Sequence, residues 1–230
     1  MKSYISMMAM ALFLALPLQA AAQDISEDRV RELVLETIRE ARQAEAQAAS
    51  QAEVLSRERD TLERDPNAPV LGNPEGDVTV VEFFDYNCPY CRRAKPEIEA
   101  LLAADPDVRL VYREWPILGE GSVFAARAAL AAREQGLYED FHWALMGMSG
   151  RAEESSVLRI AEDIGLDVAQ LRRDMEAPEI DAHIESSMRL AQALGITGTP
   201  SFVIGDALVP GVVDVEQLSS LVSDAREPEQ

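Results

Sequence analysis

Apolar runs and helical patterns follow one another from residue 78 to the end of the chain. VTVVEFFDY (78 to 86) is an apolar run of the length that buried strands have, and residues 107–116 form a second one. Residues 88–104 between them have a helical pattern that contains Pro96. Further elements are predicted as helices at 122–135, 138–148, 155–165, 167–177, 178–195 and 214–225, and as a hairpin at 197–211 around Gly205-Asp206. This order predicts an α/β protein whose mixed sheet is covered by helices.

Residues 24–65 contain no glycine, proline or aromatic residue and predict one long helix that ends before Pro66. Spacings of four and three connect a thin stripe in which seven of nine positions are apolar or alanine. The stripe consists of Val34, Ile38, Ala41, Glu45, Ala48, Ala52, Leu55, Arg59 and Leu62. So few large side chains leave an isolated helix marginal in water. We therefore expect a stalk through which copies of the chain assemble; a helix laid on the domain and a mobile acidic spacer are the alternatives.

The first 22 residues have the pattern of a secretory signal peptide. Lys2 precedes the apolar segment 7–18, which is short for a membrane span, and three alanines at 20–22 fit a cleavage site. The expected domains are a signal peptide at 1–22, a stalk at 23–65 and a catalytic domain at 66–230. Export to the periplasm is the predicted localisation, with no transmembrane anchor after cleavage; an uncleaved anchor is the alternative.

The formal net charge of −20 narrows the choice of partners. Nucleic acids and anionic lipid surfaces attract basic proteins, so we expect neither as a partner. The acidity also serves solubility and identifies no ligand by itself.

Two cysteines, Cys88 and Cys91, lie three apart between the first strand and the helix that follows it. The first turn of a helix favours a thiolate, because its N–H groups are unpaired and the helix dipole is positive there. Cys88 is therefore the expected nucleophile, and Cys91 lies one turn further along, where it can resolve a mixed disulfide. A zinc site normally needs four ligands, and the chain has no second cysteine pair and only His142 and His183, which lie far away in the sequence. The spacing favours redox chemistry over a metal site or a structural disulfide, with no metal or cofactor.

Two segments together resemble the DsbA-like family of exported thiol-disulfide oxidoreductases. They are FFDYNCPYCRRAKPEIEALL (83 to 102) and GITGTPSFVIG (195 to 205), separated by about one hundred mostly helical residues. The resemblance covers roughly residues 66–225 and implies a thioredoxin fold with a helical insertion at about 119–195, between the second strand and a cis-proline hairpin. The leading helix lies outside it, and resembles that of the stalked, oligomeric suppressor-of-copper-sensitivity C proteins of the same family.

The resemblance also implies roles for individual residues. Cys88 matches the nucleophile and Cys91 the resolving cysteine, while Pro89 and Tyr90 match the dipeptide that tunes the redox potential. A purely protein-based exchange reaction with no cofactor is implied.

Two further positions match the family pattern away from the cysteine pair. Thr199-Pro200 matches the loop whose proline is cis, faces the active cysteines and binds an extended client segment. Glu82 matches the buried acid beneath the resolving cysteine, where burial raises a carboxyl pKa and allows proton exchange. A surface-facing Glu82, or one paired with Lys95 or Arg113, is the alternative.

The predicted function is thiol-disulfide exchange with exported client proteins, together with a redox partner protein that reduces or oxidises the pair. A stalk that multiplies active sites favours an isomerase or reductase. A monomeric oxidase and a non-enzymatic copper-binding chaperone or scaffold, with the two thiolates as copper(I) ligands, are the alternatives.

Overall fold

The computed structural model describes residues 27–227, so the predicted signal peptide and the first three residues of the predicted helix lie outside the described residues. The elements are α1 (Glu27–Arg64), β1 (Val70–Gly72), β2 (Val78–Phe84), α2 (Pro89–Ala104), β3 (Val108–Glu114), α3 (Glu120–Ala131), a 3-10 turn (Ala132–Gln135), α4 (Tyr138–Gly147), α5 (Glu154–Asp163), α6 (Val168–Asp174), α7 (Pro178–Ala193), β4 (Ser201–Ile204), β5 (Ala207–Pro210) and α8 (Val215–Arg226). No helix within this range has the length and hydropathy needed to cross a bilayer.

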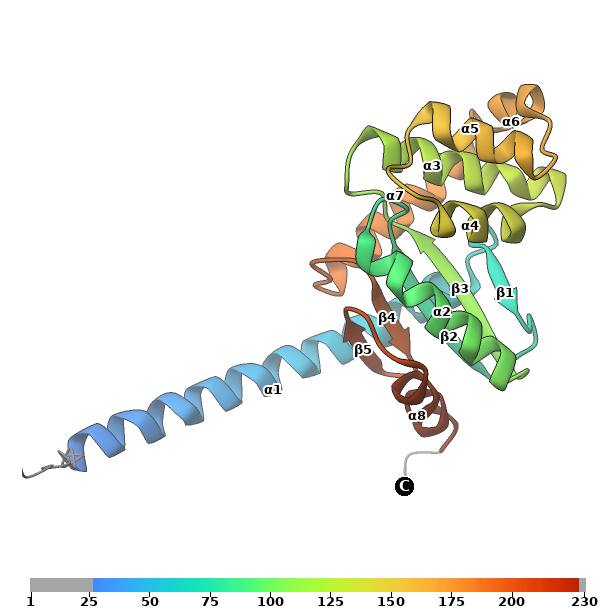
Figure 1. Cartoon of the computed structure of the whole chain (residues 1–230). Coiled ribbons are helices and arrows are strands. Elements are labelled where there is room, and N and C mark those ends of the chain that lie inside the picture. The colour runs from blue at the N-terminus through green and yellow to red at the C-terminus, as the bar shows by residue number, and fades with distance from the viewer. Residues whose placement is uncertain (1–26, 228–230) are drawn as a thin grey trace, which may run out of the picture. The chain divides into compact units, whose positions relative to one another are not determined.

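The five strands form one mixed sheet in the order β1-β3-β2-β4-β5. β2 and β3 run parallel, whereas β4 is antiparallel to β2 and β5 is antiparallel to β4. α2 and α8 pack together and α8 contacts β2, while α3, α4, α5 and α6 gather beyond one end of the sheet (Figure 1). This confirms the predicted thioredoxin-like α/β fold with a helical insertion between β3 and β4.

Successive residues of β2 serve two different cores, because strand side chains alternate between the faces of a sheet. Val80 and Phe84 join the core that contains α2, α3 and α4. Val81 and Phe83 join a second core with residues of α1 and α7. β2 is thus buried on both faces, which explains its nearly unbroken apolar run.

β1 is a short strand that the sequence analysis did not predict. Its three residues pair with β3 in antiparallel register, with Val70 opposite Val111. Proline at 69 and 74 frames this short edge strand, and an edge position tolerates the missing N–H groups.

Helix α1 contributes to both of the units into which the chain divides, residues 1–46 and residues 47–230. In residues 27–46 the large apolar side chains, Val30, Leu33, Val34, Leu35 and Ile38, are between 43% and 51% exposed. In the second unit Leu55 and Leu62 of α1 are only 1% exposed and belong to the second core. Residues 47–64 of α1 therefore pack as part of the second unit.

We expect Leu62→Ala to lower the free energy of unfolding by about 2–5 kcal/mol, because it removes a buried side chain and leaves a cavity in the second core. Leu35→Ala is the matched control on the exposed part of α1 and should change stability by no more than about 0.5 kcal/mol. Urea unfolding of both variants measures the difference, and equal losses would contradict the packing of α1 on the body.

Candidate active site

Cys88 lies where the chain turns from β2 into α2. It is the N-cap residue of α2, and Pro89 follows at the first helical position, where a missing N–H costs nothing. The backbone N–H of Cys88 donates to the Asp85 carbonyl at 3.0 Å, and its own carbonyl accepts from the Arg92 N–H at 3.2 Å. The predicted position at the head of a helix is therefore observed.

The Cys88 sulfur has a strongly stabilised thiolate. A hydrogen bond from the Cys91 thiol, assisted by the Thr199 hydroxyl and by the N–H groups of Cys91 and Tyr90, outweighs burial and lowers the pKa of Cys88 to about 5. In the thiol form Sγ donates to the Thr199 carbonyl at 3.2 Å. At neutral pH Cys88 is therefore ionised, which is the reactive form of a cysteine.

Access to the Cys88 sulfur is restricted. The residue is only 4% exposed. Its contact with the Thr199 carbonyl covers part of the sulfur, so a client disulfide has to compete for this position. Tyr90, in contrast, is 53% exposed, with the Arg93 guanidinium 4.3 Å from the centre of its ring.

Cys91 has the opposite electrostatic environment from Cys88. It is completely buried on α2, and both cysteines are free thiols in the structure. Burial, the hydrogen bond to Cys88 and the nearby Glu82 charge all raise the pKa of Cys91. Cys91 therefore keeps its proton while Cys88 is ionised, and the two sulfurs divide the roles of nucleophile and reserve thiol.

Glu82 lies in the middle of β2 and is fully buried. Neither carboxylate oxygen has a hydrogen-bond partner among residues 27–227. The alternative ion pairs do not form, because Lys95 pairs with Glu99 and Arg113 with Asp65. Burial, followed by the negative charge of Cys88, raises the pKa of Glu82 well above its usual value.

The loop before β4 brings Thr199 and Pro200 to the cysteines across more than one hundred residues of sequence. The Thr199-Pro200 peptide bond is cis. The Pro200 carbonyl accepts from the Gly211 N–H at 2.8 Å, and the Ser201 hydroxyl donates to the Gly198 carbonyl at 2.8 Å. These bonds hold the loop so that Thr199 faces Cys88, as the resemblance implies.

The loop between β2 and α2 is braced by residues that the sequence analysis did not single out. The Asp85 carboxylate accepts from the Ser122 hydroxyl at 2.7 Å and from the N–H groups of Ile117 and Leu118 at 2.8 and 2.9 Å. The Asn87 side chain exchanges two hydrogen bonds with the backbone of Ala152. Two polar residues directly after an apolar strand were the available signal for this brace.

Arg92 adds a third brace on the other side of the same loop. Its guanidinium donates to the carbonyls of Tyr86 at 3.0 Å, Met148 at 3.2 Å and Gly150 at 2.6 Å. The helical insertion is therefore bonded directly to the loop that carries Cys88.

The two histidines lie in the core, away from the cysteine sulfurs. The Nδ1 atom of His142 lies 3.0 Å from the Tyr86 hydroxyl, and burial together with the Lys95 charge lowers the pKa of His142 to about 3. Burial opposes the charged form of His183, but hydrogen bonds with Asp65 and Glu114 raise its pKa. Both histidines take part in core packing and buried hydrogen bonding.

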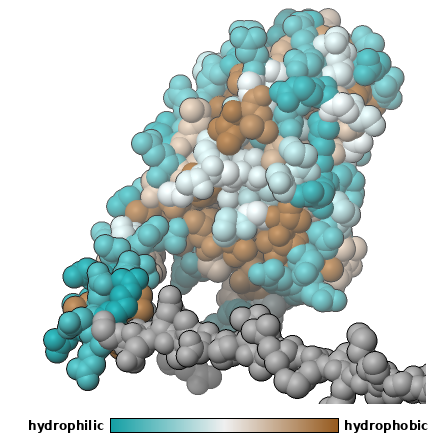
Figure 2. Space-filling model, turned by 60° about the vertical axis from the view of Figure 1, so that its left-hand side comes forward, coloured by the Kyte–Doolittle hydropathy of each residue, from teal (hydrophilic) through white to brown (hydrophobic). Residues whose placement is uncertain are grey.

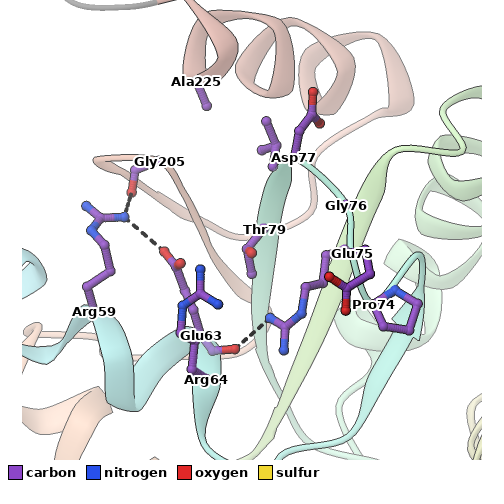
Figure 3. A pocket seen from close by; sticks show the side chains of 12 residues that line it. Arg59, Glu63, Arg64, Pro74, Glu75, Gly76, Asp77, Thr79, Gly205 and Ala225 are labelled. Carbon is purple, nitrogen blue, oxygen red and sulfur yellow. Dashed lines mark hydrogen bonds and ion pairs between the residues drawn. The ribbon is translucent and has the colours of Figure 1, made fainter.

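A polar pocket of about 340 Å³ lies at the other end of β2 (Figure 3). Arg59 donates to the Glu63 carboxylate at 2.9 Å and to the Gly205 carbonyl at 3.2 Å, and Arg109 donates to the Glu63 carbonyl at 2.6 Å. Thr79, near the start of β2, lines this pocket, whereas Cys88 follows the end of the strand. The pocket is therefore separate from the cysteine site.

Comparison with known families decides the class of the site. Residues 79–223 match the model of the DSBA-like thioredoxin domain, which is more than half of the chain. The chain belongs to this family. The chain carries the Cys88-Cys91 pair, and the match confirms the family predicted from the cysteine and Thr-Pro motifs.

Solved structures extend the likeness of this DsbA-like chain. A thioredoxin-like oxidoreductase from Silicibacter pomeroyi is 72% identical with a TM-score of 0.74, and covers 74% of this chain and 99% of its own. A linker-deletion mutant of ScsC from Proteus mirabilis is 30% identical with a TM-score of 0.76, and covers 90% of this chain and 98% of its own.

A curated relative of the DsbA-like chain is the Na(+)/H(+) antiporter NhaA 3 of Salinispora tropica, 33% identical over 158 residues. The match covers 68% of this chain but 24% of the relative. The chain thus spans about a quarter of the length of that relative.

We expect the thiolate absorbance of the reduced protein to titrate with a midpoint at about 5. Cys91→Ala should raise this midpoint, because it removes the hydrogen bond that contributes most to the Cys88 thiolate. Cys88→Ala is the control and should show no thiolate signal at neutral pH, since burial keeps Cys91 protonated. An unchanged midpoint in Cys91→Ala contradicts the assigned hydrogen bond.

Proposed function

We propose that the chain is an exported enzyme that exchanges disulfides with client proteins, with Cys88 as nucleophile and Cys91 as resolving thiol. The observation that carries this proposal is the opposite ionisation of two adjacent sulfurs. Hydrogen bonds lower the pKa of Cys88, whereas burial raises that of Cys91. A thiolate beside a protonated thiol is the arrangement that attacks a disulfide and then closes the ring.

The first step is attack by the Cys88 thiolate on a client disulfide. The new bond joins Cys88 Sγ to one client sulfur, and the electron pair of the broken bond leaves on the other client sulfur, which takes a proton from solvent. Ionisation has a second effect, because a thiolate no longer donates to the Thr199 carbonyl. That carbonyl is then free to accept a client N–H, so Thr199 and Pro200 bind an extended segment beside the sulfur.

In the resolving step Cys91 gives its proton to the Glu82 carboxylate and attacks Cys88 Sγ. The Cys88-Cys91 bond forms, the bond from Cys88 to the client breaks, and the client leaves as a thiolate. Burial raises the pKa of Glu82, which brings its basicity closer to that of a thiol and favours this transfer. Pro89 and Tyr90 tune the redox potential between the two sulfurs.

We propose isomerase or reductase activity in preference to oxidase activity. An isomerase attacks wrong disulfides with its reduced form, so this activity needs a pair that is kept as two thiols. The likeness to ScsC over 90% of this chain, a span that reaches into α1, agrees with an oligomeric enzyme that presents several sites to one client. A separate redox partner protein keeps the pair reduced, and the periplasm is the proposed compartment.

Assembly is proposed to use the exposed apolar side chains of residues 27–46. Val34 and Ile38 lie one turn apart on one face of α1, with Ala41 next along the same face. Such a stripe stabilises a helix in water when it packs against copies of itself. Residues 47–64 already pack on the catalytic unit, so the proposed interface is shorter than the expected 24–65.

Refolding of scrambled ribonuclease, measured beside oxidation of reduced ribonuclease, tests the activity and its direction. We expect the reduced protein to restore scrambled ribonuclease and Cys88→Ala to lose all exchange. Cys91→Ala should accumulate mixed disulfides with the client, because the resolving thiol is absent. Fast oxidation without isomerisation contradicts the proposed direction, and full activity in Cys88→Ala contradicts the mechanism.

Light scattering tests the assembly. We expect the chain that begins at Gln23 to have a multiple of its monomer mass, and a shortened chain that begins at Gln47 to be monomeric with its fold intact. Val34→Lys together with Ile38→Lys should also separate the copies, since a charge in an apolar helix interface lacks a partner. Equal monomer masses for the long and short chains reject the assembly.

A further inference from the structure

Three oxygen atoms in the core lack the hydrogen bonds that their burial demands. They are both carboxylate oxygens of Glu82 and the hydroxyl of Tyr112, none of which has a partner among residues 27–227. Both residues are fully buried. Burying a polar group without a partner costs on the order of 1–3 kcal/mol, and more for a charged group. The Glu82 carboxylate is an acceptor and the Tyr112 hydroxyl is a donor, so each could satisfy the other.

The sheet places these two side chains next to each other. Glu82 of β2 and Tyr112 of β3 are partners in the parallel register. Side chains at aligned positions of neighbouring strands point to the same face. Val80, Phe84 and Leu110, which share this face, pack in the core that also contains Cys91. Cys91, Glu82 and Tyr112 are therefore gathered between the sheet and α2.

The pKa shifts of these groups agree with their proximity in the sheet. After burial, the Glu82 charge is the largest cause that raises the pKa of Tyr112, and Cys91 also contributes. The Glu82 charge in turn raises the pKa of Cys91. The phenol therefore stays protonated and remains a donor throughout the reaction.

Two other polar groups that face this region are already hydrogen-bonded. The Tyr86 hydroxyl bonds to Nδ1 of His142 at 3.0 Å, and Glu114 accepts from the Tyr138 hydroxyl at 2.7 Å. His142 packs its ring against that of Tyr112, with 4.2 Å between the centroids, and its Nε2 atom also has no partner among residues 27–227. Burial and the Lys95 charge lower the pKa of His142, so its ring adds no charge beside Glu82.

The Cys88 thiolate, at the start of α2, is the charged group that raises the pKa of Glu82. Its side-chain hydrogen-bond partners are Cys91 and Thr199, and Tyr112 is not among them.

We propose that the Tyr112 hydroxyl is the hydrogen-bond donor to the Glu82 carboxylate, directly or through one internal water, and so holds Glu82 ready to accept the proton of Cys91. Tyr112 is a positioning residue, because it touches neither sulfur nor client. A donor to a carboxylate stabilises the ionised form. Without this donor, burial keeps Glu82 protonated to higher pH, and a protonated Glu82 cannot take the Cys91 proton.

The inference rests on the proposed role of Glu82, and a titration of the reduced protein without client tests it separately. Carbon-13 NMR of the Glu82 carboxyl, assigned with Glu82→Gln, should show a midpoint about one pH unit higher in Tyr112→Phe than in the natural protein. Tyr138→Phe is the matched control, because it removes another buried phenol that bonds to Glu114 instead. An unchanged Glu82 midpoint in Tyr112→Phe overturns the proposal even where Cys88 exchange is intact.

A measurement on the natural protein decides the matter if Tyr112→Phe fails to fold. The Cζ resonance of Tyr112 should shift with the Glu82 midpoint, and this shift should vanish in Glu82→Gln. A Cζ resonance that ignores Glu82 overturns the proposal.

Kinetics separate this positioning role from a merely structural one. Release of glutathione from its mixed disulfide with Cys88 follows the resolving step alone. Tyr112→Phe should slow this release about tenfold at neutral pH and move its pH profile upward by about one unit. In the Glu82→Gln background the same substitution should have no further effect. A slowing that is equal at every pH, or that persists in Glu82→Gln, overturns the proposal.

Discussion

The stabilisation of one thiolate by hydrogen bonds is the interaction on which the rest of the site depends. Hydrogen bonds from Cys91, from Thr199 and from two N–H groups of α2 lower the pKa of Cys88, whereas burial opposes them. Short-range donors act only when they are correctly placed. The strand-to-helix turn supplies the N–H groups, and the loop before β4 supplies the Thr199 side chain, so two distant parts of the chain must meet at one sulfur.

Burial gives Cys88, Cys91 and Glu82 different roles, although the three groups lie close to one another. Cys88 receives donors at the helix start, whereas Cys91 and Glu82 meet an apolar environment that disfavours charge. The buried Cys91 thus keeps its proton, while Cys88 at the start of the helix carries a negative charge. Thiol-disulfide exchange uses this difference in ionisation, because the Cys88 sulfur attacks first and the Cys91 sulfur follows after it has lost its proton.

The features that could be predicted from the sequence are those that depend on a pattern of residues close together in the chain. The apolar run of β2, the cysteine spacing and Thr199-Pro200 each carry a local pattern, and Glu82 is conspicuous inside an apolar strand. Other features depend on distant partners. The side chain of Asn87 bonds to residues 35 and 65 positions away, which no local pattern encodes. For Leu55 and Leu62, a helical stripe predicts burial equally well against a second helix or against the body, and only the tertiary fold decides.

The brace of Asp85 and Asn87 has a consequence for redesign of the protein. A designer could shorten the protein by removing the helical insertion, because the strands and α2 form the thioredoxin-like part without it. Here the catalytic turn borrows the Ser122 hydroxyl and the Ala152 backbone from the insertion. Excising residues 119–195 strips partners from a buried carboxylate and a buried amide at the foot of the reactive cysteine. A shortened protein must replace these hydrogen-bond donors and acceptors if the turn that carries Cys88 is to keep its geometry.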